Sequence, residues 1–252
     1  MAIALTTLVE EAERFLGASR ISDYCPNGLQ VEGRPQVRRI VSGVTASQAL
    51  LDAAVEAEAD VVLVHHGYFW KGENPCVVGI KQRRLKTLLT QDISLLAYHL
   101  PLDVHPEVGN NVQLARQLDI TVEGPLEPDN PRTVGLIGSL AEPLTPRDFA
   151  RRVQDVLGRE PLLVEGSGMI RRIGWCTGGG QGYIDTAIAA GVDLYLTGEA
   201  SEQTFHSARE NGISFIAAGH HATERYGVQA LGDYLARRFA IEHLFIDCPN
   251  PI

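Results

Sequence analysis

The feature that most limits how this chain can fold is an internal repeat. Residues 38–43 and residues 171–176 both read as a short apolar strand that passes a glycine-containing turn and leads into an alanine-rich helix. Asp60 and Asp193 then open a second apolar strand in each copy, at the same offset of 133 residues (171 − 38 and 193 − 60). One offset held over twenty-odd residues indicates a duplicated unit.

The spacing of apolar residues predicts strands that alternate with helices in both copies. Thr45 and Gln48 form a capping-box pattern for the first helix, and Thr145 is a typical N-cap with Pro146 at the first helical position. Alternating strands and helices form βαβ units with parallel strands. The expected strands span residues 61–64, 93–97, 194–196 and 213–217, and the expected helices span residues 46–57 and 183–190.

We therefore expect two similar α/β domains with mostly parallel sheets, related by an approximate two-fold axis. The segment 123–131 is rich in proline and acidic residues and is expected to link them, so that the domains cover residues 1–127 and 128–252. The last helix, near residues 227–239, or the last strand could instead pack on the other half.

Composition allows a full hydrophobic core without disulfides or a structural metal, because 44% of the 252 residues are hydrophobic and 21% are charged. A metal in this chain is therefore expected to be functional. The formal net charge of −9 disfavours broad binding to nucleic acid or to anionic membranes. A small anionic substrate is still compatible with this charge if cations line its pocket locally.

The four cysteines, Cys25, Cys76, Cys176 and Cys248, are far apart and form no C-x-x-C pair, as expected for reduced thiols of a cytosolic protein. The N-terminal residues include acidic side chains by position ten and no basic stretch, which does not match a signal peptide. No apolar run approaches the roughly 18–20 residues that cross a bilayer. We expect a cytoplasmic protein without membrane association.

Two adjacent histidine pairs stand out among the eight histidines. His65 and His66 follow the expected strand at residues 61–64, and ligand sites of open parallel sheets gather at the carboxyl ends of strands. Adjacent side chains of a regular strand point to opposite faces, but Gly67 would let the backbone turn so that both imidazoles face one crevice. The alternative is a polar strand end whose imidazoles have structural hydrogen bonds.

The ends of two further strands carry an imidazole and a carboxylate at one spacing. His99 precedes Asp103 by four residues and His220 precedes Glu224 by four, at a shared offset of 121 (220 − 99 and 224 − 103). Residues four apart share one face of a helix and can reach one ion. Pro101 favours a more extended backbone in the first copy.

The second copy has Gly198 and Glu199 where the first has its histidine pair, so the expected site is asymmetric and lies between the two domains. Three imidazoles and two carboxylates are too many for one tetrahedral zinc ion. They suit two metals about 3.5–4 Å apart that share a carboxylate and a water. Without thiolate ligands, Zn, Mn, Fe, Co and Ni are all compatible.

Together with several further motifs, these residues resemble the type 2 GTP cyclohydrolase I family, also described through the yeast NGG-interacting factor. The resemblance covers residues 7–247, and its motifs are highly specific in combination. They are residues 23–31 (DYCPNGLQV), 64–67 (VHHG), 99–103 (HLPLD), 197–199 (TGE) and 219–225 (GHHATER).

The resemblance implies two divalent metal ions per subunit. The residues that match the ligands of the family are all present, and they are His65, His66, Asp103, His220 and Glu224. The resemblance also implies a two-domain α/β protein that assembles as a toroidal homohexamer, with the metal sites facing the central cavity.

The implied reaction is the hydrolysis of GTP to 7,8-dihydroneopterin triphosphate and formate. Water activated by the metals would attack C8 of guanine, because metals lower the pKa of bound water towards 7. His99 is our candidate for the catalytic acid–base group, since it is the repeat partner of a ligand without belonging to the ligand set. His99 could equally orient a neighbouring ligand, and His105 and His221 are weaker candidates.

Two other functions fit the same ligands, namely a metal-dependent hydrolase of another nucleotide or phosphoester, and a metal-binding regulatory or partner-binding protein without turnover. A triphosphate substrate would need hydrogen-bond donors in its binding site. Amides of the glycine-rich turn at residues 177–182 could cradle phosphate, although a plain turn is the simpler interpretation. A basic cluster on an expected helix is usually a solvated face; here it comprises Lys81, Arg83, Arg84 and Lys86.

Overall fold

The computed structural model describes residues 2–252, which form two compact units. The first unit ends at Gly109 and also contains Gly227–Pro249, whereas the second contains Asn110–Tyr226 and Asn250–Ile252. Each unit has a sheet covered by helices, so the expected α/β class is confirmed. The division differs from the expected boundary at residues 127 and 128, because the chain returns to the first unit near its C-terminal end.

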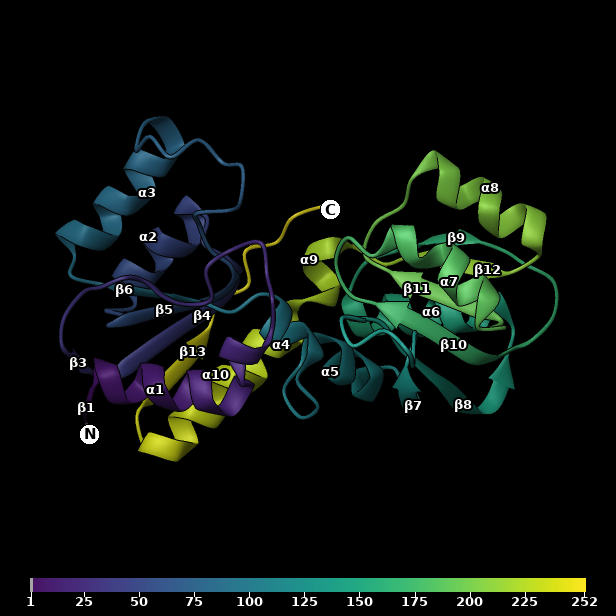
Figure 1. The fold of residues 1–252 in the computed structure, drawn as a ribbon, viewed down its shortest axis with the longest axis horizontal. Helices are drawn as coiled ribbons and strands as arrows, with labels where there is room; N and C mark the ends of the chain where they lie inside the picture. Colours follow the sequence, from purple (N-terminus) through teal and green to yellow (C-terminus); the bar gives the residue numbers. More distant parts are fainter. Residues whose placement is uncertain (1) are drawn as a thin grey trace. The chain divides into compact units, whose positions relative to one another are not determined.

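The sheet of the first unit has five strands. In order across the sheet they are β13 (Glu242–Phe245), β4 (Arg39–Thr45), β5 (Val61–His66), β6 (Ser94–Ala97) and β2 (Gly28–Val31). Four of them are parallel, and β2 pairs with β6 in the antiparallel sense. Helices α2 (Gln48–Glu56) and α3 (Gly79–Thr90) cover one face, and α1 (Leu5–Leu16) and α10 (Arg225–Phe239) cover the other (Figure 1). Because both faces of β5 are buried, its sequence is a continuous apolar run.

The sheet of the second unit is mixed, so the expectation of a mostly parallel sheet is wrong for this half. In order across the sheet its strands are β7 (Thr121–Pro125), β8 (Leu136–Leu144), β10 (Ile170–Cys176), β11 (Leu194–Thr197), β12 (Ser214–Ala217) and β9 (Leu162–Val164). The central trio β10–β11–β12 is parallel, and the outer strands pair antiparallel. Antiparallel neighbours such as β7 and β8 can follow each other directly, whereas parallel strands need a crossover helix.

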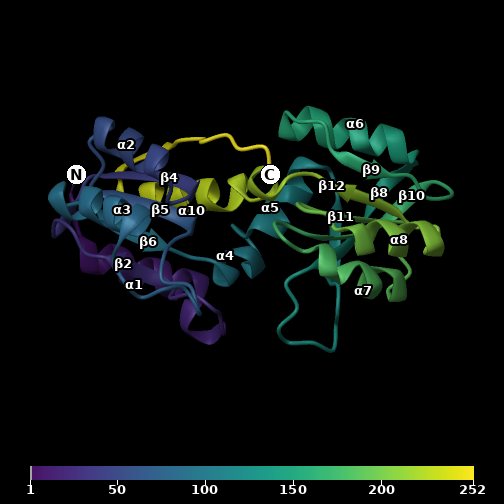
Figure 2. The same cartoon turned by 90° about the horizontal axis from the view of Figure 1, so that it is seen from above.

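Helices cover both faces of this second sheet (Figure 2). One face carries α5 (Asn110–Gln117) and α6 (Pro146–Leu157), and the other carries α7 (Ile184–Ala189) and α8 (Glu202–Asn211). The smaller elements of the chain are β1 (Ile3–Ala4), β3 (Gln36–Val37), η1 (Ala18–Arg20), η2 (Gln181–Tyr183), α4 (Leu100–Val104) and α9 (His220–Thr223). Within residues 2–252, no helix combines the length and hydrophobicity that a membrane span requires. The four cysteines are free thiols, as expected.

A shared hydrogen-bond pattern marks the start of the repeat in both units. The Asp60 carboxylate accepts the backbone N–H groups of Arg38 and Arg39 at 2.7 and 3.1 Å. The Asp193 carboxylate accepts those of the two equivalent arginines at 3.0 and 2.7 Å. Each aspartate thus satisfies two backbone donors at the amino end of a strand pair, which explains why this residue recurs at a constant offset.

Two local expectations are wrong for identifiable reasons, and one is confirmed. The N-cap of α2 is Ser47 rather than Thr45, because the Ser47 hydroxyl accepts the N–H of Leu50. Residues 123–125 of the expected linker belong to β7, because their backbone pairs with β8. The Thr145 cap of α6 is confirmed.

The C-terminal helix and strand, drawn in yellow, lie among the purple and blue elements of the first unit (Figure 1). A hydrogen-bond chain that runs from the core to the surface fixes them there. Ser42 Oγ of β4 lies 2.7 Å from His243 Nε2 of β13, and His243 Nδ1 lies 2.7 Å from Asp233 Oδ1 of α10. The Ser42 side chain is inaccessible in mid-strand, so this Ser–His–Asp arrangement joins secondary-structure elements and offers no nucleophile to a substrate.

Gly232 provides a test of this packing, because a methyl group at this position of α10 would overlap the His243 ring. On an exposed helix, Gly→Ala stabilises by up to about 1 kcal/mol. Here we expect Gly232→Ala to lower the free energy of unfolding by about 1–3 kcal/mol through overpacking, as measured by chemical denaturation. In a His243→Ala background the same change should be neutral or stabilising, and an equal loss in both backgrounds would contradict the explanation.

Candidate metal centre

The first histidine pair lies at the carboxyl end of β5, and both imidazoles have an oxygen partner at Nδ1. His65 Nδ1 lies 2.9 Å from the carbonyl oxygen of Tyr98, and His66 Nδ1 lies 3.1 Å from the hydroxyl oxygen of Thr45. The two ring centroids are 4.5 Å apart. Because a histidine that donates Nδ1–H to a carbonyl carries its lone pair on Nε2, this arrangement suits a metal ligand.

Helix α4 carries His99 and Asp103 at its two ends. His99 is the N-cap, and Asp103 Oδ1 lies 3.5 Å from His65 Nε2. The expectation that Pro101 keeps this segment extended is wrong, because proline is tolerated in the first helical turn, where N–H groups have no partner within the helix. One nitrogen each from His65, His66 and His99 lies within 4.8 Å of the others. The structure therefore brings the candidate residues of the first unit together.

Asp23, to which the sequence analysis assigns no role, holds His99 in place. Its carboxylate lies 3.0 Å from His99 Nδ1 and accepts the Asn27 side-chain N–H at 3.0 Å and the Leu100 backbone N–H at 2.9 Å. Burial by itself raises the pKa of Asp23, but these donors hold that pKa well below its usual range. Asp23 and Asn27 belong to the motif at residues 23–31. The same residues would also suit a plain turn, so the sequence by itself does not reveal their contacts with His99.

The thiol of Cys25 lies beside the same two groups, since one atom each from Asp23, Cys25 and His99 lies within 4.8 Å of the others. Burial raises the pKa of Cys25 to about 12, and the charge of Asp23 adds to this effect. A thiol that stays protonated is a poor metal ligand and a poor nucleophile. This agrees with the expected absence of thiolate ligands.

In the second unit, His220 lies between two carboxylates. His220 Nε2 is 3.2 Å from Glu224 Oε2, and His220 Nδ1 is 2.6 Å from Glu199 Oε1. Burial lowers the pKa of His220, but the two carboxylates outweigh it and raise the pKa to about 9. A metal ion at Nε2 would therefore displace a proton. Glu199 occupies the repeat position of His66 (199 − 66 = 133), which is the sequence signal that could have revealed its role.

The glycine-rich turn of the second unit packs against these ligands, and two of its glycine amides are bonded within the fold. The N–H of Gly178 donates to Thr223 Oγ1 and that of Gly180 donates to Thr197 Oγ1, both at 3.0 Å, so neither is available to a ligand. A Cβ at Gly178 would overlap the Glu224 carboxylate. Glycine is needed there for this close approach, and the φ of +68° at Gly178 also favours glycine.

The two weaker histidine candidates have backbone partners. His105 is buried, with Nε2 3.0 Å from the Phe15 carbonyl oxygen and Nδ1 accepting the N–H groups of Glu107 and Val108 at 3.2 Å. Because Nδ1 accepts two backbone N–H groups it carries no proton, and burial lowers the pKa of His105 in the same direction. These contacts give the ring a structural role. His221 is buried in α9, and its backbone N–H donates to the carbonyl of the C-terminal residue.

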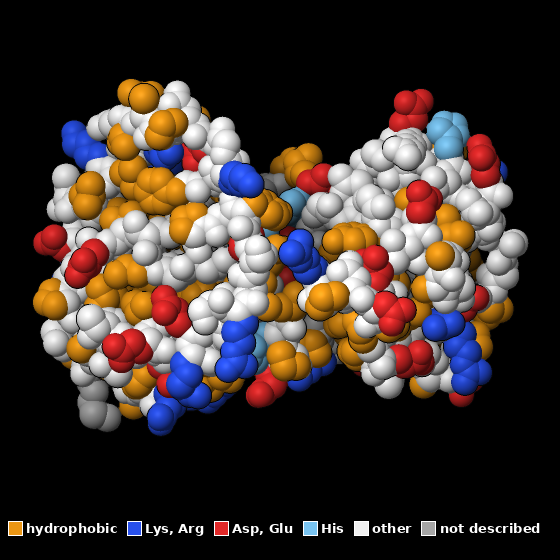
Figure 3. Space-filling view, in the orientation of Figure 1, with side chains coloured by type: hydrophobic (Ala, Val, Ile, Leu, Met, Phe, Trp, Pro, Cys, Tyr) orange, Lys and Arg blue, Asp and Glu red, His pale blue; other side chains and the backbone are white. Residues whose placement is uncertain are grey.

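The basic cluster on α3 is only partly a solvated face, because the Lys81 side chain is 11% exposed and Arg84 is half-buried over the Tyr68 ring. Lys81 lies 3.4 Å from Glu73 and over the Phe69 ring, while Arg83 and Lys86 are exposed. On the face shown in Figure 3, acidic side chains lie among the basic ones in both units.

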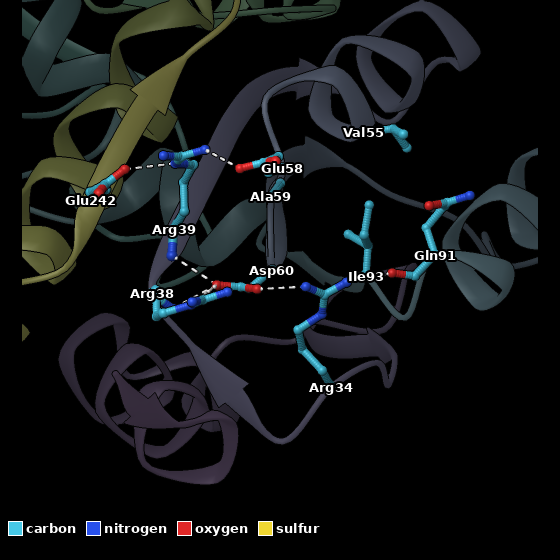
Figure 4. Close-up of a pocket in the computed structure, with 10 residues that line it drawn as sticks. All are labelled: Arg34, Arg38, Arg39, Val55, Glu58, Ala59, Asp60, Gln91, Ile93 and Glu242. Carbon is cyan, nitrogen blue, oxygen red and sulfur yellow. Dashed lines mark hydrogen bonds and ion pairs between the residues drawn. The ribbon is translucent and has the colours of Figure 1, made fainter. Parts of the chain in front are cut away.

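A cavity of about 400 Å³ lies at the opposite end of the first sheet, where β4, β5 and β13 begin (Figure 4). Arg34 bonds Asp60 at 3.0 Å and the Gln91 carbonyl at 2.7 Å, and Arg39 bonds Glu242 at 2.7 Å. The charged lining residues are Arg34, Arg38, Arg39, Glu58, Asp60 and Glu242. Since their charges balance and the guanidinium groups have partners, this cavity is a structural network at the amino ends of the strands.

A sequence model of the DUF34/NIF3 family (NGG1p interacting factor 3) matches residues 3–251. The chain belongs to the NIF3 family. Among curated relatives, a Pseudomonas aeruginosa protein is 85% identical over 251 residues and fully covered in both chains. An Escherichia coli protein is 54% identical over 248 residues, which cover 98% of each chain. Both relatives are called "GTP cyclohydrolase 1 type 2 homolog", and the resemblance seen in the motifs is confirmed.

Solved structures of NIF3-like proteins also match this chain over its length. The structure titled "protein ybgI, unknown function" is 53% identical with a TM-score of 0.95, and the match covers 99% of this chain and 100% of that one. The protein TTHA1606 from Thermus thermophilus is 35% identical with a TM-score of 0.91 and the same coverage. The fold assignment therefore rests on both sequence and structure.

The structural role assigned to His105 in this NIF3 protein can be tested by stability. His105→Ala removes a buried acceptor from two backbone N–H groups, so we expect the free energy of unfolding to fall by about 1–3 kcal/mol. His206, which is exposed on α8, is the matched control, and His206→Ala should stay within about 0.5 kcal/mol of the parent chain. Equal stabilities of the two variants in urea denaturation would contradict this role.

Proposed function

We propose that this NIF3 protein is a dinuclear, divalent-metal-dependent hydrolase of the GTP cyclohydrolase I type. The reaction would convert GTP and water into 7,8-dihydroneopterin triphosphate and formate. The proposal rests on the hydrogen bonding of three imidazoles. The Nδ1 atoms of His65, His66 and His220 each have an oxygen partner. Oxygen partners at Nδ1 direct Nε2 to an ion and are typical of metal-ligating histidines.

The ligands in this proposal are His65, His66, Asp103, His220 and Glu224. The donor set fits the group, because it combines neutral imidazoles with carboxylates, which bind Zn, Mn, Fe, Co and Ni. When bound, a metal pair would act as a Lewis acid and make a water molecule nucleophilic at neutral pH.

Aromatic side chains beside the first-unit histidines support a planar substrate. The rings of Tyr24 and Trp70 each lie 5.0 Å from the His99 ring, and Trp70 lies 6.0 Å from His66. Tyr24 is 53% exposed, so its ring is accessible for stacking. A nucleobase gains about 1–3 kcal/mol from stacking on such a ring, which favours a nucleotide over an aliphatic phosphoester.

The names of the relatives supply GTP as the specific nucleotide. Another nucleotide would use the same metals and the same stacking surface, and a metal-binding regulatory protein would need neither stacking nor an accessible acid–base group. His99 is the group we assign to proton transfer. The toroidal homohexamer that the family resemblance implies and the cytoplasmic location expected from the sequence stay predictions.

The first test is metal content together with formate release from GTP. We expect about two metals per chain in protein purified without chelator, and formate release with Mn, Zn, Fe or Co added. Glu224→Gln should remove at least one metal and lower turnover at least ~100-fold, because it replaces a charged ligand. Glu202→Gln, at an exposed position on α8 of the same unit, should change neither quantity.

The possible outcomes separate the alternatives. Two metals with formate release that the Glu224 variant loses would support the proposal. Two metals without formate release would exclude GTP, and release of phosphate or of a base from other nucleotides would then be measured. A chain that binds no metal would rule out the dinuclear site.

The glycine turn offers a second test that changes no ligand. Gly178→Ala should displace the Glu224 carboxylate and lower metal affinity at least ~10-fold. Changes to the residues that orient a metal ligand usually lower metal affinity by at least this factor. Gly182 belongs to the same turn, but a Cβ there meets no atom within 4 Å, so Gly182→Ala is the matched control. Competition with a chelating dye measures both affinities, and equal values would contradict the packing argument.

A further inference from the structure

Both units keep an imidazole at the same place in the repeat and bond its Nδ1 to a carboxylate. His220 Nδ1 lies 2.6 Å from Glu199, and His99 Nδ1 lies 3.0 Å from Asp23. The carboxylates come from different parts of the repeat, since Glu199 follows β11 whereas Asp23 precedes β2. The two units thus form the same carboxylate–Nδ1 contact with carboxylates from different parts of the chain. This recurrence indicates that the contact is needed at both histidines.

The Asp23 carboxylate is built to stay ionised. Its side chain is 2% exposed, and its oxygens accept N–H groups from Tyr24 at 2.7 Å, Asn27 at 3.0 Å and Leu100 at 2.9 Å in addition to His99. A buried carboxylate surrounded by donors persists as an anion. An anion at Nδ1 favours the tautomer of the neutral ring that carries its proton on that nitrogen and its lone pair on Nε2.

The backbone fixes the direction of the His99 ring as well. The backbone N–H of His99 donates to Asn27 Oδ1 at 2.7 Å, and Asn27 in turn donates to Asp23. The remaining faces of the ring are enclosed, because the rings of Tyr24 and Trp70 each lie 5.0 Å away. The ring of His65 lies 5.0 Å from that of His99 as well, and one nitrogen each from His65 and His66 lies within 4.8 Å of one of His99.

Capping alone does not explain this set of contacts. Asp23 accepts the first N–H of α4, which an asparagine or serine would do equally well. A helix cap does not require a second bond to an imidazole, nor an asparagine that holds the same imidazole by its backbone. These additional contacts all act on the orientation and the tautomer of His99.

We propose that Asp23 is a positioning residue that makes His99 the acid–base group of the site. This inference rests on the proposed hydrolase function. His99 Nε2 takes a proton from the attacking water as the C–O bond forms, and returns it to the leaving nitrogen as the C–N bond breaks. Asp23 keeps the Nδ1 proton in place throughout, so the dyad ends in its starting state and no redox partner is needed.

The decisive variant is Asp23→Asn, which preserves size and removes the charge. We expect kcat to fall about 10²- to 10⁴-fold, the usual contribution of an acid–base group, with KM and metals per chain unchanged. His99→Gln should cause a loss of similar size, and the double variant should be no worse than either single one, because the two residues act as a unit. Asp193→Asn, which changes a carboxylate that also accepts two backbone N–H groups, is the control.

A second readout does not depend on turnover. In nitrogen NMR spectra of histidine-labelled protein, His99 of the parent chain should show a protonated Nδ1, and Asp23→Asn should alter that signal alone among the eight histidines. Thermal unfolding establishes that the variant is folded. Loss of metal from Asp23→Asn, kcat within about threefold of the parent, or an unchanged His99 signal would each overturn the proposal.

These measurements also separate the two proposals. If the parent chain binds two metals but hydrolyses no GTP, the hydrolase assignment fails. The NMR comparison then decides by itself whether Asp23 sets the tautomer of His99. If GTP is hydrolysed and Asp23→Asn turns over normally, the hydrolase assignment stands and the dyad is excluded.

Discussion

The candidate centre depends on the parallel pairing of the three middle strands in each unit. Parallel strands end at the same edge of a sheet, so whatever follows β5 lies beside whatever follows β6. This pairing brings His65 and His66 next to His99, although more than thirty residues separate them in the chain. The pairing of β11 with β12 does the same for Glu199 and His220 in the second unit. A shift of register by one residue would turn these side chains to the other face.

Oxygen partners then determine what the imidazoles can do. The carbonyl beside His65 and the carboxylate beside His220 can only accept, so they place a proton on Nδ1, whereas the hydroxyl beside His66 can donate or accept. His105 shows the contrasting case, because both of its nitrogens bond to backbone groups and its ring serves the fold. The number of histidines therefore says less about function than the atoms that surround each ring.

The two units agree at the start of the sequence repeat and differ beside their parallel strands. Asp60 and Asp193 satisfy the same backbone donors in both sheets, so the start of the repeat is preserved. Beside the first parallel trio lies β13 and beside the second lies β8, which runs antiparallel. The Ser42–His243–Asp233 chain holds the C-terminal segment in the first unit, and this contact moves the unit boundary away from residue 127.

The sequence by itself determined the repeat, the α/β class, the family and the residues at the strand ends. Offsets, periodicity and motifs are patterns of residues along the chain, so they can be recognised without knowing which distant residues meet. It also indicated the Thr145 cap, since a hydroxyl at a helix start needs a partner only three residues away. Only the tertiary structure decided the roles of Asp23, Asn27 and Glu199, the use of the glycine-turn amides, and the return of the last helix and strand to the first unit. Each of these depends on hydrogen bonds or packing between residues far apart in the chain, and a single sequence carries no direct record of which distant atoms meet.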